Sequence, residues 1–288
     1  MDGPVTDGSA ADGSVARRMW RPHELVHDVV YFSQEPRAAA DAIGMRGYWM
    51  GYFAFRVAPL GPVGPAPVIA AFHGFPPSVV TRALPDAWSY ATPEQALEAR
   101  ASGAAAALRR LWGSDVDVAE AADLAWTAAR AADDAGRVLG AANRAMPRPD
   151  DPVRALWQAA TTLREHRGDG HVAVLVARGI GPVHAHLLKL ASGGIDHDML
   201  RQSRRWSDQD WTAAGTDLRE RGWLDADGRL TGTGTAERDE IERRTDAAAV
   251  APWAALGPER TARLAELLDP LAAAVTGELP RGNPVGLG

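Results

Sequence analysis

Apolar residues recur every three to four positions along most of the chain, which is the spacing of helices that bury one face. Residues 17–32 show this clearly, because Trp20, Leu25, Val29 and Phe32 fall on one stripe. In the first half, the same pattern with its glycine and proline boundaries predicts further helices over residues 35–44, 48–61, 65–75, 76–88, 92–113 and 117–145.

The second half follows a proline-rich stretch, residues 146–152, which is typical of a linker. A helix is expected over residues 153–167, then a turn at 168–170 in the sequence Gly-Asp-Gly, then a new apolar helix from His171. Further helices are expected over residues 181–193, 196–203, 206–222, 235–256 and 257–275, and the expected N-caps are Thr92, Asp117 and Ser207.

The two halves of the chain resemble each other. Residues 37–61 align with residues 171–193, and Trp20 and Trp157 precede these blocks at comparable distances. Chance similarity between alanine-rich helices is the alternative. A true duplication would fold as two pseudo-symmetric halves with a groove between them. The expected organisation is a disordered leader (1–16), an N-terminal half (17–145), the linker (146–152), a C-terminal half (153–276) and a flexible tail (277–288).

The C-terminal half contains a pattern of its own at residues 206–246, where a helix leads into "RGWL", a turn at Asp227-Gly228, and "LTGTGTAERDEIE". This pattern resembles the winged-helix domain of MarR-type regulators, in which a short β-wing follows the recognition helix. The whole chain, over about residues 17–275, resembles an actinobacterial family described as helix-turn-helix-like. That likeness is carried by "ELVHDVVYF", "GYWMGYFAFRVAPLGPVG", "EHRGDGHVA" and "APWAALG". The resemblance implies a mainly α fold of two winged-helix-like halves, with a small β-wing in the second.

The charge of the presumed DNA-reading face argues against DNA. Residues 196–229 carry eight acidic and six basic residues, a net charge of −2. A DNA reader needs several phosphate contacts from Lys or Arg, and here the expected wing tip, "DADG", carries two aspartates. Only one feature of this face favours DNA binding, the cluster of Arg201, Arg204 and Arg205. DNA therefore stays a disfavoured partner.

The composition is that of a globular protein, with a formal net charge of −6 over 288 residues. The chain has no cysteine, which excludes disulfides and thiolate chemistry and fits a cytoplasmic location. No apolar run is long enough to span a bilayer, and the start lacks the apolar core of a signal peptide, so no membrane partner is expected. Lys189 is the only lysine, which we attribute at this level to codon usage.

The stretch "REHRGDGHV", residues 164–172, concentrates ionisable side chains. His171 and His166 are candidate general bases, and Glu165 and Asp169 are candidates for orienting the imidazole, because a neighbouring carboxylate fixes its tautomer and raises its basicity. Arg167 is a candidate for binding an anionic group of the ligand. The structural alternative is a turn in which Asp169 caps a helix and Glu165 pairs with Arg167. A metal site fits this spacing poorly, and none is expected.

Two further groups come from the first half. His27 and Tyr31 share one helix face with His23, which suits either a pocket wall or a helix interface. The aromatic segment at 48–56 includes Tyr52 and Arg56 and is either core or the wall of a pocket that stacks a flat ligand and binds its carboxylate.

These patterns predict a protein that binds a small organic molecule between its halves. An enzyme of specialised metabolism that acts on this molecule by acid/base chemistry is compatible with the same residues. The main alternative is a MarR-like regulator that uses the same groove for an effector, and a non-catalytic scaffold is a third. No cofactor can be named. The sequence is compatible with a monomer or a homodimer.

Overall fold

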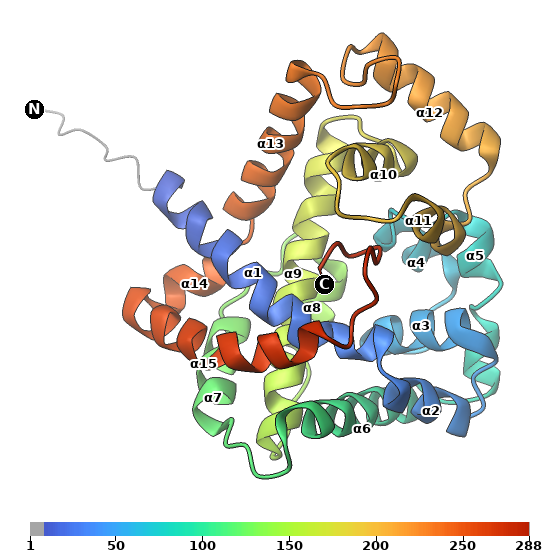
Figure 1. Ribbon diagram of the computed structural model, residues 1–288. Helices are drawn as coiled ribbons and strands as arrows, with labels where there is room; N and C mark the ends of the chain where they lie inside the picture. Colours follow the sequence, from blue (N-terminus) through green and yellow to red (C-terminus); the bar gives the residue numbers. More distant parts are fainter. Residues whose placement is uncertain (1–8, 288) are drawn as a thin grey trace, which may run out of the picture.

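The computed structural model describes residues 9–287 and is mainly helical (Figure 1). Its helices are α1 (Ser9–Phe32), α2 (Gln34–Ala42), α3 (Gly47–Val57), η1 (Ala58–Leu60), α4 (Pro65–Ala71), α5 (Pro77–Thr81), η2 (Asp86–Ser89), α6 (Pro93–Trp112), α7 (Ala119–Arg130), α8 (Val138–Arg144), α9 (Pro152–Ala177), α10 (Pro182–Ala191), α11 (His197–Arg204), α12 (Asp208–Glu220), α13 (Gly232–Ala247), α14 (Ala251–Leu256) and α15 (Pro258–Thr276). Within this part of the chain, no single helix is long and apolar enough to cross a membrane, and two sharply bent helix pairs pass that test only when combined.

Helix α9 is the axis of the molecule. It runs through the centre of Figure 1 and packs against α1, α6, α7, α8 and α13. Its first half is almost entirely buried, and Leu156 and Trp157 are each 1% exposed. Because helices from both ends of the chain pack on α9, its side chains are placed to meet groups that are distant in the sequence.

The hydrophobic core does not follow the expected division into two halves, because one cluster contains residues from both of them. One hydrophobic cluster combines residues of α1, α6 and α7 with the first half of α9 and with α14 and α15. The apolar stripe of α15, with Leu264 and Leu268 buried, lies against α1 and α7. Residues after 249 therefore complete the core of the N-terminal half. The internal duplication itself stays a prediction, although both blocks place a helix, a left-handed glycine (Gly44 and Gly179) and a second helix in succession.

The expected turn at residues 168–170 is wrong, because α9 continues through it without a break. Gly170 serves close packing instead. A Cβ on Gly170 would lie 2.4 Å from Nη1 of Arg137, whose guanidinium donates to the carbonyls of His166 and Ala248. Asp169 points to α8, where it caps another helix rather than its own.

Other boundaries also differ from expectation. The long helices predicted over 117–145 and 235–256 are each broken in two, at 131–137 and 248–250. The predicted β-wing contains one antiparallel bridge, Leu224 with Leu230, and no strand forms anywhere in residues 9–287. Thr92 and Ser207 both form capping boxes, as their positions predict, and Asp117 accepts a hydrogen bond from the amide of Ala119.

The C-terminal segment, residues 279–287, was expected to be flexible but is packed into the molecule. Asn283 is 1% exposed, and its side chain donates to the carbonyls of Pro280 and Leu287 and accepts from two amides of the same segment. The carbonyl of Gly282 accepts from the amide of Asp196 at the start of α11. In Figure 1 this end of the chain lies at the centre of the molecule. Of the expected leader, residues 9–16 belong to α1, and residues 1–8 lie outside the described part.

Candidate functional site

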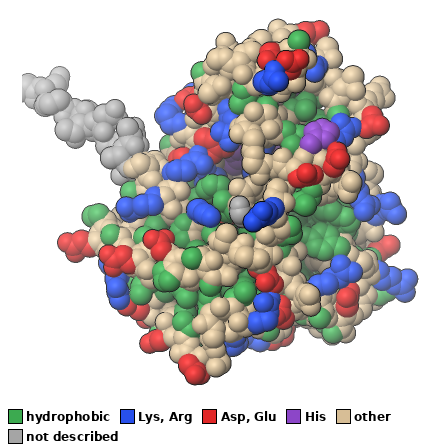
Figure 2. Space-filling model, viewed as in Figure 1, with side chains coloured by type: hydrophobic (Ala, Val, Ile, Leu, Met, Phe, Trp, Pro, Cys, Tyr) green, Lys and Arg blue, Asp and Glu red, His purple; other side chains and the backbone are tan. Residues whose placement is uncertain are grey.

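The main candidate site is a cavity of about 430 Å³, here called the central cavity. Its walls come from α1, α9, α10 and α13, from the loop after α4, and from the C-terminal segment. Figure 2 shows Lys and Arg side chains gathered around the centre of this face, where the C-terminal segment lies. The volume falls within the usual range of sites for small organic ligands.

The lining is positively charged although the whole chain is negative. Four acidic side chains line the central cavity, Glu24, Glu165, Asp169 and Glu242. Seven basic side chains line it, Arg17, Arg56, Arg164, Arg167, Lys189, Arg204 and Arg238. With histidines neutral, the lining therefore carries a net charge of +3, in contrast to −6 for the chain.

Internal ion pairs use only some of these cations. Arg17 and Arg167 both pair with Glu242 and Asp246. Arg56 and Arg164 both pair with Glu165, and Arg164 also reaches Glu24.

Three basic side chains of the lining have no carboxylate within 4 Å among residues 9–287. Lys189 donates to the carbonyl of Val285 at 2.7 Å, and the guanidinium of Arg204 lies 4.7 Å from the ring centre of Phe75. Burial lowers the pKa of Arg204. Arg238 is the third. All three residues are partly buried, so each places a charge at the cavity wall that no carboxylate of the described residues balances.

His171 lines the central cavity with a defined tautomer. Its Nδ1 lies 2.9 Å from Oγ1 of Thr245, and that hydroxyl donates its own proton to the carbonyl of Ile241. Nδ1 must therefore carry the proton, which leaves Nε2 with a free lone pair. Burial lowers the pKa of His171 to about 4, against the opposing effect of Glu242. His171 is thus neutral near pH 7 and can accept a proton or a hydrogen bond.

Glu165 occupies the wall between the central cavity and a smaller one. Its two oxygens accept from Nε and Nη2 of Arg56, at 2.9 and 2.6 Å, and Arg164 adds a third donor at 2.9 Å. Burial alone raises the pKa of this carboxyl, but Arg56 and Arg164 outweigh it and hold the pKa at about 2. Glu165 is 2% exposed and permanently ionised near neutral pH, so it can position Arg56 but cannot donate a proton.

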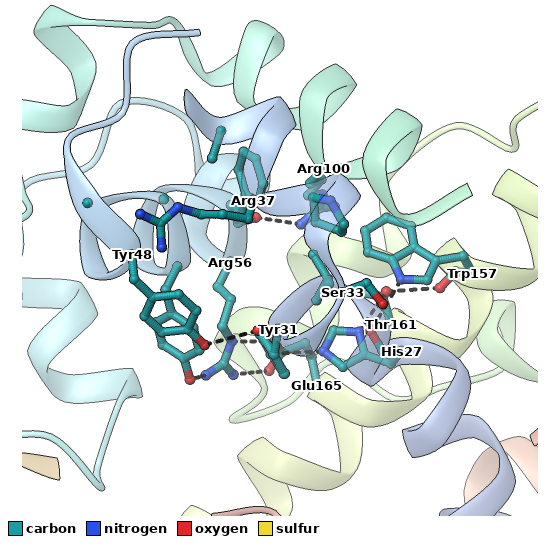
Figure 3. Close-up of a pocket in the computed structure, with 17 residues that line it drawn as sticks. His27, Tyr31, Ser33, Arg37, Tyr48, Arg56, Arg100, Trp157, Thr161 and Glu165 are labelled. Carbon is teal, nitrogen blue, oxygen red and sulfur yellow. Dashed lines mark hydrogen bonds and ion pairs between the residues drawn. The ribbon is translucent and has the colours of Figure 1, made fainter. Parts of the chain in front are cut away.

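The smaller cavity, of about 40 Å³, has room for no more than a few water molecules. Figure 3 shows its polar chain: Nδ1 of His27 lies 2.9 Å from Oγ1 of Thr161, and Nε2 of His27 lies 2.8 Å from the hydroxyl of Tyr31. The Thr161 hydroxyl donates to a helix carbonyl, so His27 carries its proton on Nδ1 and accepts from Tyr31. Tyr52 accepts from Arg56 at 2.8 Å.

The structure divides the predicted site residues into three groups. Glu165, Arg167, Asp169, His171 and Arg56 line the central cavity. His27, Tyr31 and Tyr52 line the smaller one, together with Arg56 and Glu165. His166 lines neither: its Nε2 lies 2.8 Å from Oδ1 of Asp133, on another side of α9. The pair between Glu165 and Arg167, part of the structural alternative, does not form, because Glu165 pairs with Arg56 and Arg164 and Arg167 pairs with Glu242 and Asp246.

Asp169 has a structural partner in addition to its place in the cavity wall. Its Oδ2 accepts from the amides of Leu139 and Gly140, both at 2.8 Å, which are free donors in the first turn of α8. Burial raises the pKa of Asp169 to about 6, and these amide donors oppose that shift. Asp169 is therefore a cap for a neighbouring helix.

Sequence reasoning missed five of the seven basic residues that line the central cavity, namely Arg17, Arg164, Lys189, Arg204 and Arg238. The one available signal was that Lys189 is the only lysine among 31 basic residues. Within residues 9–287, no group of three or more His, Asp or Glu side chains is arranged to hold a metal ion.

The helices α10, α11 and α12 follow one another as in a helix-turn-helix unit, with α10 packed on α12. The three arginines that favoured DNA are turned to intramolecular partners. Arg201 pairs with Asp208, Arg204 lies over Phe75, and Arg205 lies over Trp49.

A model of a helix-turn-helix family matches residues 16–280, nearly the whole chain. The chain belongs to this helix-turn-helix family. No curated protein and no solved structure matches it. Membership in the helix-turn-helix family agrees with the mainly helical architecture and with the succession of α10, α11 and α12.

Proposed function

We propose that this protein binds a small anionic organic molecule in the central cavity. The observation that carries the proposal is that Lys189, Arg204 and Arg238 line the cavity without a carboxylate partner in the described chain. A carboxylate or phosphate group of a ligand would supply the missing counter-charge, and charge-assisted hydrogen bonds are stronger than neutral ones. Phe72 and Phe75 add apolar surface for the organic part of the ligand.

We also propose that the protein acts on this molecule by acid/base chemistry, with His171 as the general base. Nε2 of His171 has a lone pair and forms no hydrogen bond with any residue of 9–287. We assign Glu165 to positioning Arg56, since its carboxylate is held by two guanidinium groups. His166 takes no part in this assignment because Asp133 holds it away from the cavity.

A DNA-binding regulator is the second candidate, favoured by the helix-turn-helix family match. In that case α10–α12 and residues 223–231 would form a winged-helix-like unit of MarR type, with α3–α5 as its counterpart. The pairing of Arg201 with Asp208 and of Arg229 with Asp227 argues against free phosphate contacts on this face. We expect no retention of duplex DNA in a gel at about 150 mM salt, where phosphate contacts are already weakened. A sequence-dependent shift at nanomolar protein would favour the regulator.

The test of anion binding is a thermal-shift titration with benzoate and with benzamide, which has nearly the same shape but no charge. Benzoate at about 100 times its Kd should add about 2.7 kcal/mol to the free energy of unfolding. Benzamide should have little effect. In the Arg204→Gln variant the benzoate shift should be lost, whereas Arg229→Gln, an exposed control, should keep it. Equal shifts for benzoate and benzamide, or for wild type and Arg204→Gln, would refute the proposal.

A further inference from the structure

The only lysine of the chain, Lys189, lies in the wall of the central cavity, and codon usage does not explain this placement. It is the single lysine of a chain in which every other basic residue is arginine, and it lies on α10 in the wall of the central cavity. Its Nζ donates to the carbonyl of Val285, 96 residues away in the sequence. An arginine at this position would supply the same charge, so the difference between the two side chains lies in the amine.

The surroundings of Lys189 favour a reactive amine. No carboxylate in residues 9–287 lies within 4 Å of Nζ, because Glu24 and Glu242, which line the same cavity, pair with Arg164, Arg17 and Arg167. Burial lowers the pKa of Lys189 to about 8, although Glu242 opposes the shift. An amine of this kind has a substantial neutral, nucleophilic fraction near neutral pH, unlike an exposed lysine.

A proton carrier shares the cavity. His171 lines the same wall with its Nε2 lone pair free, and the charge of Lys189 is close enough to lower the pKa of His171. Formation of an imine needs one group that takes a proton from the amine and returns it to the departing oxygen. A neutral imidazole can do both.

We infer that Lys189 forms a Schiff base with a small carbonyl compound that bears an anionic group, such as a 2-oxo acid. This inference rests on the proposed function, since the anionic group is what the cavity cations would bind. The carbonyl carbon would then lie next to the amine, and the carboxylate would meet Arg204 or Arg238.

The step balances without a co-reactant. The neutral amine of Lys189 attacks the carbonyl carbon, forming the C–N bond, and the carbonyl electron pair moves to oxygen. Nε2 of His171 takes a proton from the nitrogen, which has become cationic on attack, and passes it to this oxygen. His171 then carries the second nitrogen proton to the hydroxyl, the C–O bond breaks as the nitrogen lone pair forms the C=N bond, and water leaves. Nothing is oxidised or reduced.

The test is reductive trapping of the full-length protein with pyruvate and cyanoborohydride, followed by mass spectrometry and peptide mapping. The chain has one ε-amine, so only the α-amine of the first residue competes with Lys189. Labelling of Lys189 should saturate with pyruvate concentration, as binding in a cavity requires, whereas labelling of the α-amine should rise linearly. Lys189→Arg, which keeps the charge, should lose the saturable label.

Lactate separates the two proposals because it has the carboxylate without the carbonyl. Thermal stabilisation by both lactate and pyruvate without a label on Lys189 would overturn the Schiff base and leave anion binding intact. Linear labelling of Lys189, at the rate of the α-amine, would also overturn it. No stabilisation by pyruvate, lactate or benzoate would overturn both.

Discussion

His171 and Thr245 form a hydrogen bond that decides which nitrogen of the imidazole carries its proton. Because the hydroxyl of Thr245 is committed to the carbonyl of Ile241, it can only accept from Nδ1 of His171. The ring is thereby held with Nε2 as an acceptor at the central cavity. The bond joins α9 to α13 and so makes the state of the site depend on how these two helices pack.

The low pKa of His171 predicts a loss of stability in mild acid. Below pH 6.5 the unfolded chain binds a proton on this residue, whereas the folded protein does so only near pH 4. Stability is therefore lost as the pH falls from 6.5 towards 4. Between pH 7 and pH 5, urea unfolding of His171→Gln should show about 1–2 kcal/mol less loss than wild type. The exposed His197→Gln should behave like wild type, and an equal loss in all three proteins would contradict the assignment.

The ion pair between Arg56 and Glu165 predicts a large cost when one partner loses its charge. Glu165→Gln leaves Arg56 buried without a carboxylate and Arg164 with Glu24 alone, and it should lower the free energy of unfolding by about 3–5 kcal/mol. Glu98→Gln breaks the exposed pair with Arg154 and should cost no more than about 1 kcal/mol. Chemical denaturation of both variants measures the difference. Similar costs would mean that the buried pair is not fully desolvated.

Asp169 is expected to matter to α8 rather than to α9. Asp169→Ala removes the acceptor of two amides and should cost about 1–2 kcal/mol, the usual value of a helix cap. Hydrogen exchange locates the effect, since protection should fall at Leu139 and Gly140. Loss of protection around residues 170–174 instead would show that the aspartate supports its own helix.

The C-terminal segment should contribute measurably to stability. Asn283→Ala removes a buried side chain that makes four hydrogen bonds to the backbone of its own segment, and should cost about 1–3 kcal/mol. Arg281→Ala changes an exposed residue of the same segment and should stay within about 0.5 kcal/mol. Thermal unfolding compares the two. A mobile segment would make both substitutions neutral.

Local signals in the sequence were sufficient for part of this structure. Thr92 and Ser207 could be placed at helix starts because a capping box is a contact within four residues. The stretch around Glu165 could be singled out because its charges interrupt an otherwise alanine-rich helix. Such features need no knowledge of tertiary packing.

The remaining features depend on packing that a single sequence does not encode locally. Gly170 suggested a turn, but its missing side chain makes room for Arg137, which is 33 positions earlier in the chain. The partners of Glu165 could not be chosen among so many arginines: one of them, Arg164, is its neighbour in the chain, but the other, Arg56, is 109 residues away. The position of Lys189 in a cavity wall could not be predicted, because it depends on the contact between α10 and the C-terminal segment.

The wall formed by Arg56 and Glu165 has one more consequence. Both residues face the central cavity and the smaller cavity, and Arg56 also binds Tyr52. Any occupant that draws Arg56 towards one side must weaken its contacts on the other. Thermodynamic linkage makes this effect mutual. If a molecule in the smaller cavity changes the affinity of the central cavity for its ligand by some factor, that ligand changes the affinity of the smaller cavity by the same factor. Tyr52, which does not line the central cavity, would thus influence the affinity for the ligand there through its hydrogen bond with Arg56.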